Sequence, residues 1–135
     1  MQSAEPVIYS IGQAPLHILL HLGVALVALV IGAAILVRRK GTQSHRFLGR
    51  VWVALMLTAA AGSFFIQARG RLSLIHVLSI LVLLIVPLGA YLAHTHRIRA
   101  HRTTMSIMFA SLCVTGLFTL LPYRMLGQLV FRQSP

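Results

Sequence analysis

The chain has 135 residues, of which 58% are hydrophobic and only 10% are charged. This composition leaves too little polar surface to cover a soluble domain, so most of the chain is expected to face lipid. There are 12 Lys and Arg residues against one acid, Glu5. Because the basic residues separate long apolar runs and form no patch, they indicate membrane anchoring and not nucleic-acid binding. Hydrolase sites that need a carboxylate base, pair or metal ligand are not expected.

The sequence contains four apolar runs of about 20 residues, which is the length of a helix that crosses a bilayer. They cover residues 16–37, 48–67, 72–93 and 105–121. The first run is longer than the apolar part of a signal peptide and no Lys or Arg precedes it, so we expect it to stay in the protein. Pro122 can end the last run, and the short tail 122–135 is apolar enough to lie in the membrane interface. The sequence predicts an all-α fold, a single integral membrane four-helix bundle over residues 1–135.

The connections between these predicted helices differ in charge. The first and third carry eight Lys and Arg residues: Arg38, Arg39, Lys40, Arg46, Arg50, Arg97, Arg99 and Arg102. The second connection and the tail carry four: Arg69, Arg71, Arg124 and Arg132. Cytoplasmic loops of membrane proteins carry the excess of Lys and Arg. The charge distribution therefore predicts that the first and third connections are cytoplasmic and that both termini lie outside.

Four of the seven histidines recur in the same order in both halves of the chain. His21 and His76 lie near the starts of the first and third helices, while His45 and His101, each followed by Arg, precede the second and fourth. The spacings are 45 − 21 = 24 and 101 − 76 = 25 residues. This pattern is typical of a parallel repeat, in which two helix pairs run the same way; the alternative is coincidence. The repeat predicts an outer pair, His21 with His76, and an inner pair, His45 with His101.

Histidine pairs on facing helices are candidate ligands of haem b. A bis-histidine haem takes one imidazole from each of two helices, in an apolar slot with cations near its propionates. Small residues at positions 59–63 of the second run would allow a flat ring to approach. The candidate propionate partners are Arg69 and Arg71 on the outer side, and Arg46, Arg50 and Arg102 on the inner side. Two such sites would carry electrons across the bilayer.

Each of these histidines also has a simpler interpretation. His17 shares a helix face with His21 and could replace it as the outer ligand, or either could hydrogen-bond a neighbouring helix. Histidines inside apolar spans usually face the bundle interior, which favours His21 and His76. His45 and His101 stand at helix entrances, where phospholipid binding is at least as well supported as ligation.

Other ring side chains near the ends of the runs need no catalytic role. Trp52, Tyr91 and Tyr123 lie where an aromatic belt at the membrane surface is expected. His94 and His96 are two residues apart and point to different helix faces, so we expect no compact metal site there.

Ordered motifs along the chain resemble the bacterial membrane-protein family known as domain of unknown function 2306. They are HRFLGRV at 45–51, SFFI at 63–66, IHVLS at 75–79, HRTTM at 101–105 and GLFTLLPYR at 116–124. The family often has Gly where this chain has Tyr123, a departure that concerns the tail. Since the family has no settled activity, the resemblance implies a four-helix fold in a bacterial inner membrane. The layout is also similar to that of two-haem, four-helix b-type cytochromes, an analogy of fold alone.

The leading hypothesis is a haem b electron-transfer protein, with histidines as axial ligands and arginines as propionate partners. It would act between a quinone or external reductant and a redox partner protein, or as the membrane anchor subunit of a larger redox complex. The alternative is a non-catalytic accessory or assembly subunit whose basic loops bind anionic lipid or a partner protein. A small transporter is disfavoured because the spans contain no strongly charged residue at depth.

Overall fold

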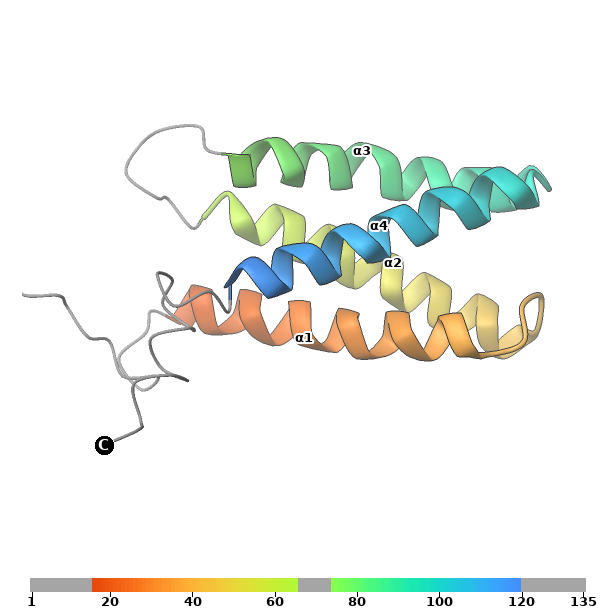
Figure 1. Ribbon diagram of the computed structural model, residues 1–135, viewed down its shortest axis with the longest axis horizontal. Coiled ribbons are helices and arrows are strands. Elements are labelled where there is room, and N and C mark those ends of the chain that lie inside the picture. Colours follow the sequence, from red (N-terminus) through yellow and green to blue (C-terminus); the bar gives the residue numbers. More distant parts are fainter. Residues whose placement is uncertain (1–15, 66–73, 120–135) are drawn as a thin grey trace, which may run out of the picture.

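The computed structural model describes residues 16–65 and 74–119, which form four α-helices (Figure 1). In chain order they are α1 (Leu16–Val37), α2 (Gln43–Ser63), α3 (Leu74–His94) and α4 (Ile98–Thr119). These residues contain no strand. The prediction of an all-α, four-helix fold is confirmed, while the predicted tail 122–135 lies outside the described residues.

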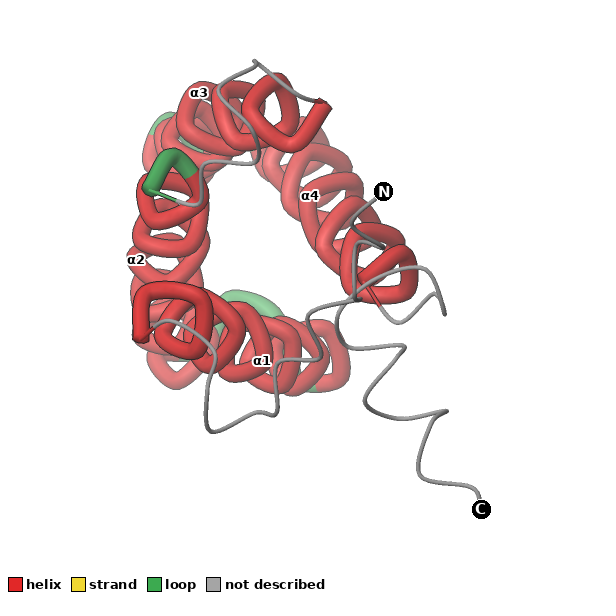
Figure 2. The backbone as a smooth tube through the Cα atoms, turned by 90° about the vertical axis from the view of Figure 1, so that its left-hand side faces the viewer, coloured by secondary structure: helices red, strands yellow, loops and turns green. Residues whose placement is uncertain are grey.

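Neighbouring helices in the bundle run in opposite directions. Helices α1 and α3 begin at one end, and α2 and α4 begin at the other (Figure 1). Each helix packs on two neighbours, so that α1 lies diagonally opposite α3 and α2 opposite α4 (Figure 2). A parallel repeat of two helix pairs predicts that α1 and α3 run the same way, as they do. We call the end that holds connections 38–42 and 95–97 the basic end, and the other the opposite end.

Helix α2 begins before its apolar run. Thr42 is the N-cap, with φ −74° and ψ 159°, and its hydroxyl accepts a hydrogen bond from the backbone N–H of His45 at 3.2 Å. A threonine at this position satisfies one of the backbone donors that the first turn leaves unpaired. The helix therefore starts at Gln43, five residues ahead of the apolar residues that begin at Leu48.

Helix α4 likewise begins at Ile98, although its apolar run starts at Met105. Backbone hydrogen bonds do not depend on side-chain polarity, so both helices continue beyond the apolar part of the sequence. The prediction that the two His-Arg pairs precede their helices is wrong: they lie in the first two turns. These residues are His45 and Arg46 in α2, and His101 and Arg102 in α4.

The C-terminus of α3 ends in a Schellman motif. The N–H of Arg97 donates to the carbonyl of Leu92 at 2.9 Å, and the N–H of His96 donates to that of Ala93 at 3.2 Å. This closure requires a left-handed residue, and His96 supplies it at φ 59°. Glycine is the usual residue there, because a Cβ is disfavoured at positive φ. The motif turns the chain directly from α3 into α4.

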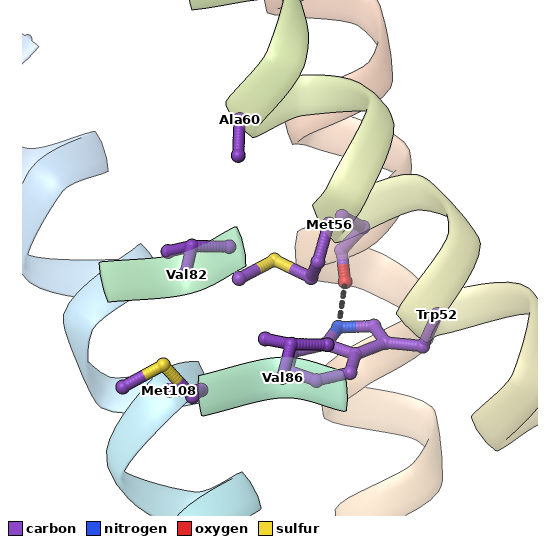
Figure 3. Packing of buried hydrophobic residues seen from close by; sticks show 7 residues of the cluster. Trp52, Met56, Ala60, Val82, Val86 and Met108 are labelled. Carbon is purple, nitrogen blue, oxygen red and sulfur yellow. Dashed lines mark hydrogen bonds between the residues drawn. The ribbon is translucent and has the colours of Figure 1, made fainter. Parts of the chain in front are cut away.

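All four helices contribute to one hydrophobic core in the middle of the bundle (Figure 3). Its buried members are Ala28 from α1, Trp52, Met56 and Ala60 from α2, Val82 and Val86 from α3, and Met108 from α4. Trp52 is 4% exposed, and its Nε1–H donates to the carbonyl of Ala28 at 3.0 Å. The interpretation of Trp52 as a membrane-surface residue is therefore wrong, because a bonded indole N–H makes burial favourable. Tyr91, by contrast, is 62% exposed.

Large apolar side chains also cover the outside of the bundle. Exposed examples are Leu26 and Val30 on α1, Leu84 and Leu88 on α3, and Leu117 on α4. Exposed apolar surface of this kind marks a protein or membrane interaction site. Two helical segments, Leu16–Val37 and His76–His94, are long and apolar enough to cross a membrane. Helices α2 and α4 carry basic residues in their first turns, which lowers their mean hydropathy.

Candidate functional site

The four repeated histidines lie in two tiers. His21 and His76 are near the starts of α1 and α3, at the opposite end, and His45 and His101 are near the starts of α2 and α4, at the basic end. His101 contacts the carbonyl of Gly89, which lies 89 − 76 = 13 residues beyond His76 on α3. At about 1.5 Å per residue, the tiers are roughly 20 Å apart along the bundle.

At the opposite end, His21 is turned toward α2. Its half-buried ring lies beside the backbone of Ala59, and a Cβ built on Gly62 would lie 3.6 Å from its Nδ1. That Nδ1 is buried and has no hydrogen-bond partner. His17, one turn earlier, is exposed. The sequence spacing of these two histidines left open which of them could be the outer haem ligand. In the structure α1 is oriented so that His21, and not His17, faces α2.

His76 completes this tier from α3. It is 8% exposed, and its ring packs against Phe64 at the end of α2, with 5.5 Å between ring centroids. One turn further along α3, Ser79 contacts Ser63 at 2.5 Å between hydroxyl oxygens. The hydroxyl of Ser63 also donates a hydrogen bond to the carbonyl of Ala60 at 2.7 Å. This pair joins α2 and α3, so Ser63 and Ala60 serve helix packing.

At the basic end, His101 is held in one tautomer. Its Nδ1 lies 2.8 Å from the carbonyl oxygen of Gly89 on α3. A carbonyl can only accept, so Nδ1 carries the hydrogen and Nε2 of the neutral ring keeps its lone pair. Gly89 lets α4 come this close to α3, because a Cβ there would lie 2.6 Å from Cε of Met105 and 3.2 Å from Cγ2 of Thr104. The backbone of α3 thus fixes the orientation of His101 and leaves the lone pair of its Nε2 free to act as a ligand.

His45 faces this ring from α2. Its Nδ1 is buried and has no hydrogen-bond partner, although the residue as a whole is only half-buried. Burial lowers the pKa of His45, and electrostatic interactions with His101 and Lys40 lower this pKa further. The neutral ring, which is the form that binds metals, is therefore favoured at pH 7. The structure brings the two histidines of this tier together.

The predicted arginine partners are only partly described. Arg46 and Arg102 are exposed at the basic end, on the same helices as the two histidines there. Arg69 and Arg71 lie outside the described residues. The sequence has one acid, Glu5, also outside that part. Within the described helices, no carboxylate side chain neutralises the cations of the basic end, which leaves them available to an anionic group.

Sequence reasoning missed three residues that shape the two tiers. Gly89 orients His101, Phe64 packs on His76, and Ser79 fixes the helix contact beside it. Ser79 alone gave a signal, since a serine within an apolar run usually hydrogen-bonds across helices. Across residues 16–65 and 74–119, no three metal-binding side chains come together. Two histidines in each tier are too few to hold a bare metal ion, but they suit a cofactor that brings the other metal ligands itself.

Comparison with known proteins identifies one family. The family model described as "Predicted membrane protein (DUF2306)" matches residues 18–134. Searches of curated proteins and of solved structures find no match. The matched range includes both histidine tiers.

Proposed function

The chain belongs to the DUF2306 family of predicted membrane proteins, and we propose that it is a haem b-binding electron-transfer protein of the bacterial inner membrane. All four helices cross the bilayer in this proposal. It acts between a quinone or external reductant and a redox partner protein, or as the membrane anchor subunit of a redox complex. The non-catalytic accessory subunit is the alternative.

The observation that carries the proposal is the state of two ring nitrogens. Nδ1 of His21 and Nδ1 of His45 are both buried without a hydrogen-bond partner, one in each tier. A buried polar atom left unpaired costs roughly 1–3 kcal/mol. Coordination to iron would offset that cost. His45 lies near His101 of the diagonally opposite helix, and the proposal pairs His21 with His76 in the same way.

The chemistry of the donor set fits a haem. The porphyrin supplies four nitrogen ligands, so the protein needs to supply only two imidazoles in each tier. Metal-binding histidines commonly donate their other ring N–H to a backbone carbonyl, which fixes the ring. His101 makes this bond to Gly89. When bound, a haem would carry single electrons, while the chain holds and orients it and excludes water.

The spacing and charge of the bundle support a path across the membrane. A separation of roughly 20 Å between tiers, set by 13 residues of α3, compares with a hydrocarbon core about 30 Å thick. The tiers would therefore lie toward opposite membrane faces. The excess of Lys and Arg in residues 38–50 and 95–102 favours a cytoplasmic basic end and outside termini.

A reduced-minus-oxidised visible spectrum of the detergent-purified protein, expressed with ample haem, tests the proposal. We expect the absorption bands of a bis-histidine b-type haem. His21→Ala or His76→Ala should remove the haem of the opposite end alone, and His45→Ala that of the basic end. His17→Ala is the matched control, since His17 is exposed one turn from His21, and it should leave the spectrum unchanged.

Two results would contradict the proposal. The first is a spectrum without haem bands, which would leave the accessory subunit as the better hypothesis. The second is a spectrum in which His17→Ala has the same effect as His21→Ala, because the orientation of α1 separates these residues. Variants that lose haem should be checked by circular dichroism for retained helix content, so that misfolding is not taken for loss of a ligand.

A further inference from the structure

A pocket of about 440 Å³ lies at the basic end, and no histidine lines it. It is lined by Leu88, Tyr91, Leu92, Thr95 and Arg97. The first three share one face of α3, and Thr95, directly after the helix, continues the spacing i, i+3, i+4 and i+7. Leu92 is half-buried, and the other four residues are exposed. The pocket therefore opens on the outside of the bundle.

The lining changes from apolar to cationic along the helix. Leu88 and Leu92 supply hydrocarbon, Tyr91 a ring with a hydroxyl group, Thr95 a second hydroxyl group, and Arg97 a guanidinium. From Leu88 to Thr95 the rise is about 10 Å. A phospholipid has the same order across the membrane surface: acyl chain, glycerol esters, then phosphate. Tyrosine is favoured at that depth because its ring is apolar and its hydroxyl group is wet.

The charge at this position requires an anion from outside the described helices. Arg97 belongs to the connection 95–97, and Arg99 and Arg102 follow in the first turns of α4. No carboxylate side chain occurs in residues 16–65 or 74–119. The Schellman motif fixes the backbone of Arg97 through its N–H bond to Leu92. Arg97 lines the pocket, so its guanidinium can donate two parallel hydrogen bonds to a phosphate bound there.

We infer that this pocket binds one anionic phospholipid of the surrounding leaflet, with its phosphate on Arg97 and an acyl chain along Leu88 and Leu92. The inference rests on the membrane placement given under the proposed function and is independent of haem. Phosphatidylglycerol is the suitable probe, and phosphatidylcholine with the same acyl chains is the zwitterionic control.

Native mass spectrometry of the full chain in detergent micelles measures the affinity for each lipid. Arg97→Gln should weaken phosphatidylglycerol binding about fivefold, which corresponds to about 1 kcal/mol for one cation at a membrane surface. Arg99→Gln removes the same charge from the first turn of α4, two residues away, but not from the pocket, and it should change the affinity less than twofold. Leu88→Trp, which fills the pocket, should weaken binding, whereas Leu84→Trp, one turn away on an exposed position, should not.

Three outcomes would overturn the inference. Equal effects of Arg97→Gln and Arg99→Gln would mean that a diffuse charge attracts the lipid. Equal affinity for the two lipids would exclude recognition of the anionic headgroup and would favour an acidic segment of a partner protein. Displacement of the lipid by inorganic phosphate at similar concentration would mean that the apolar lining contributes nothing. A haem spectrum recorded on the same samples separates failure of this site from failure of the proposed function.

Discussion

Replacing Gly32 by alanine should destabilise the bundle at the point where three helices meet. Gly32 of α1 is buried, and a Cβ there would lie 2.6 Å from a ring carbon of Phe109 and 2.7 Å from Nε1 of Trp52. Carbon atoms in contact are normally about 3.5–4.0 Å apart. Both neighbours are rigid rings, and the indole is also held by its hydrogen bond to Ala28. The rings or the helix must therefore move by roughly 1 Å.

The expected change in the free energy of unfolding combines two terms. Overpacking a well-filled core costs about 1–3 kcal/mol, and replacing glycine in a helix interior gains about 0.5–1 kcal/mol. Gly32→Ala should therefore lower stability by up to about 2.5 kcal/mol. Gly23 is the matched control, because it lies on the same helix with nothing within 4 Å of a Cβ. Gly23→Ala should raise stability by about 0.5–1 kcal/mol.

Unfolding in mixed micelles by titration with dodecyl sulfate, followed by tryptophan fluorescence, measures both variants. Trp52 is the only tryptophan of the chain, so its emission reports directly on the packed site. The emission of folded Gly32→Ala should also shift, because the indole is displaced, while that of Gly23→Ala should not. If Gly32→Ala proves as stable as Gly23→Ala, with unchanged emission, the close approach of α1 to Trp52 and Phe109 is refuted.

Two further predictions concern helix ends at the basic end. Thr42→Ala should lower the free energy of unfolding by about 1 kcal/mol, because α2 loses its N-cap. Thr42→Ser keeps the hydroxyl group and should lower the free energy of unfolding much less. Equal losses for the two variants in the same titration would show that the cap contributes nothing. His96→Gly should raise stability by about 0.5–1 kcal/mol, because relief of the left-handed conformation exceeds the added entropy of the unfolded chain. His94→Gly, inside α3, should lower stability, and a gain there would argue against this explanation.

The helices could be predicted from the sequence because lipid permits few alternatives. An apolar run of about 20 residues must satisfy its backbone hydrogen bonds internally, so the four runs could be assigned to helices without any knowledge of their packing. The starts of α2 and α4 could not be predicted in this way. They depend on the cap at Thr42 and on backbone bonds that continue past the apolar residues, while hydropathy marks only the apolar part.

The two tiers followed from the repeated order of the histidines, but the surroundings of each ring did not. His17 and His21 share a helix face in sequence, and only the packing of α1 on α2 turns one of them toward Gly62. The bond between His101 and Gly89 joins residues 12 positions apart on two helices, and it depends on how closely those helices cross. The prediction for Trp52 was wrong because a position near the end of an apolar run does not show whether the side chain faces lipid or the bundle core.

The most direct measurement is the haem content of the purified chain, determined from its pyridine haemochrome spectrum and the protein concentration. We predict haem b in each tier, hence two haems per chain in the wild type, and about half that content after His21→Ala with no change after His17→Ala. A chain that folds, retains its helices and binds no haem under haem-replete expression would contradict the assignment of the two histidine tiers as haem sites.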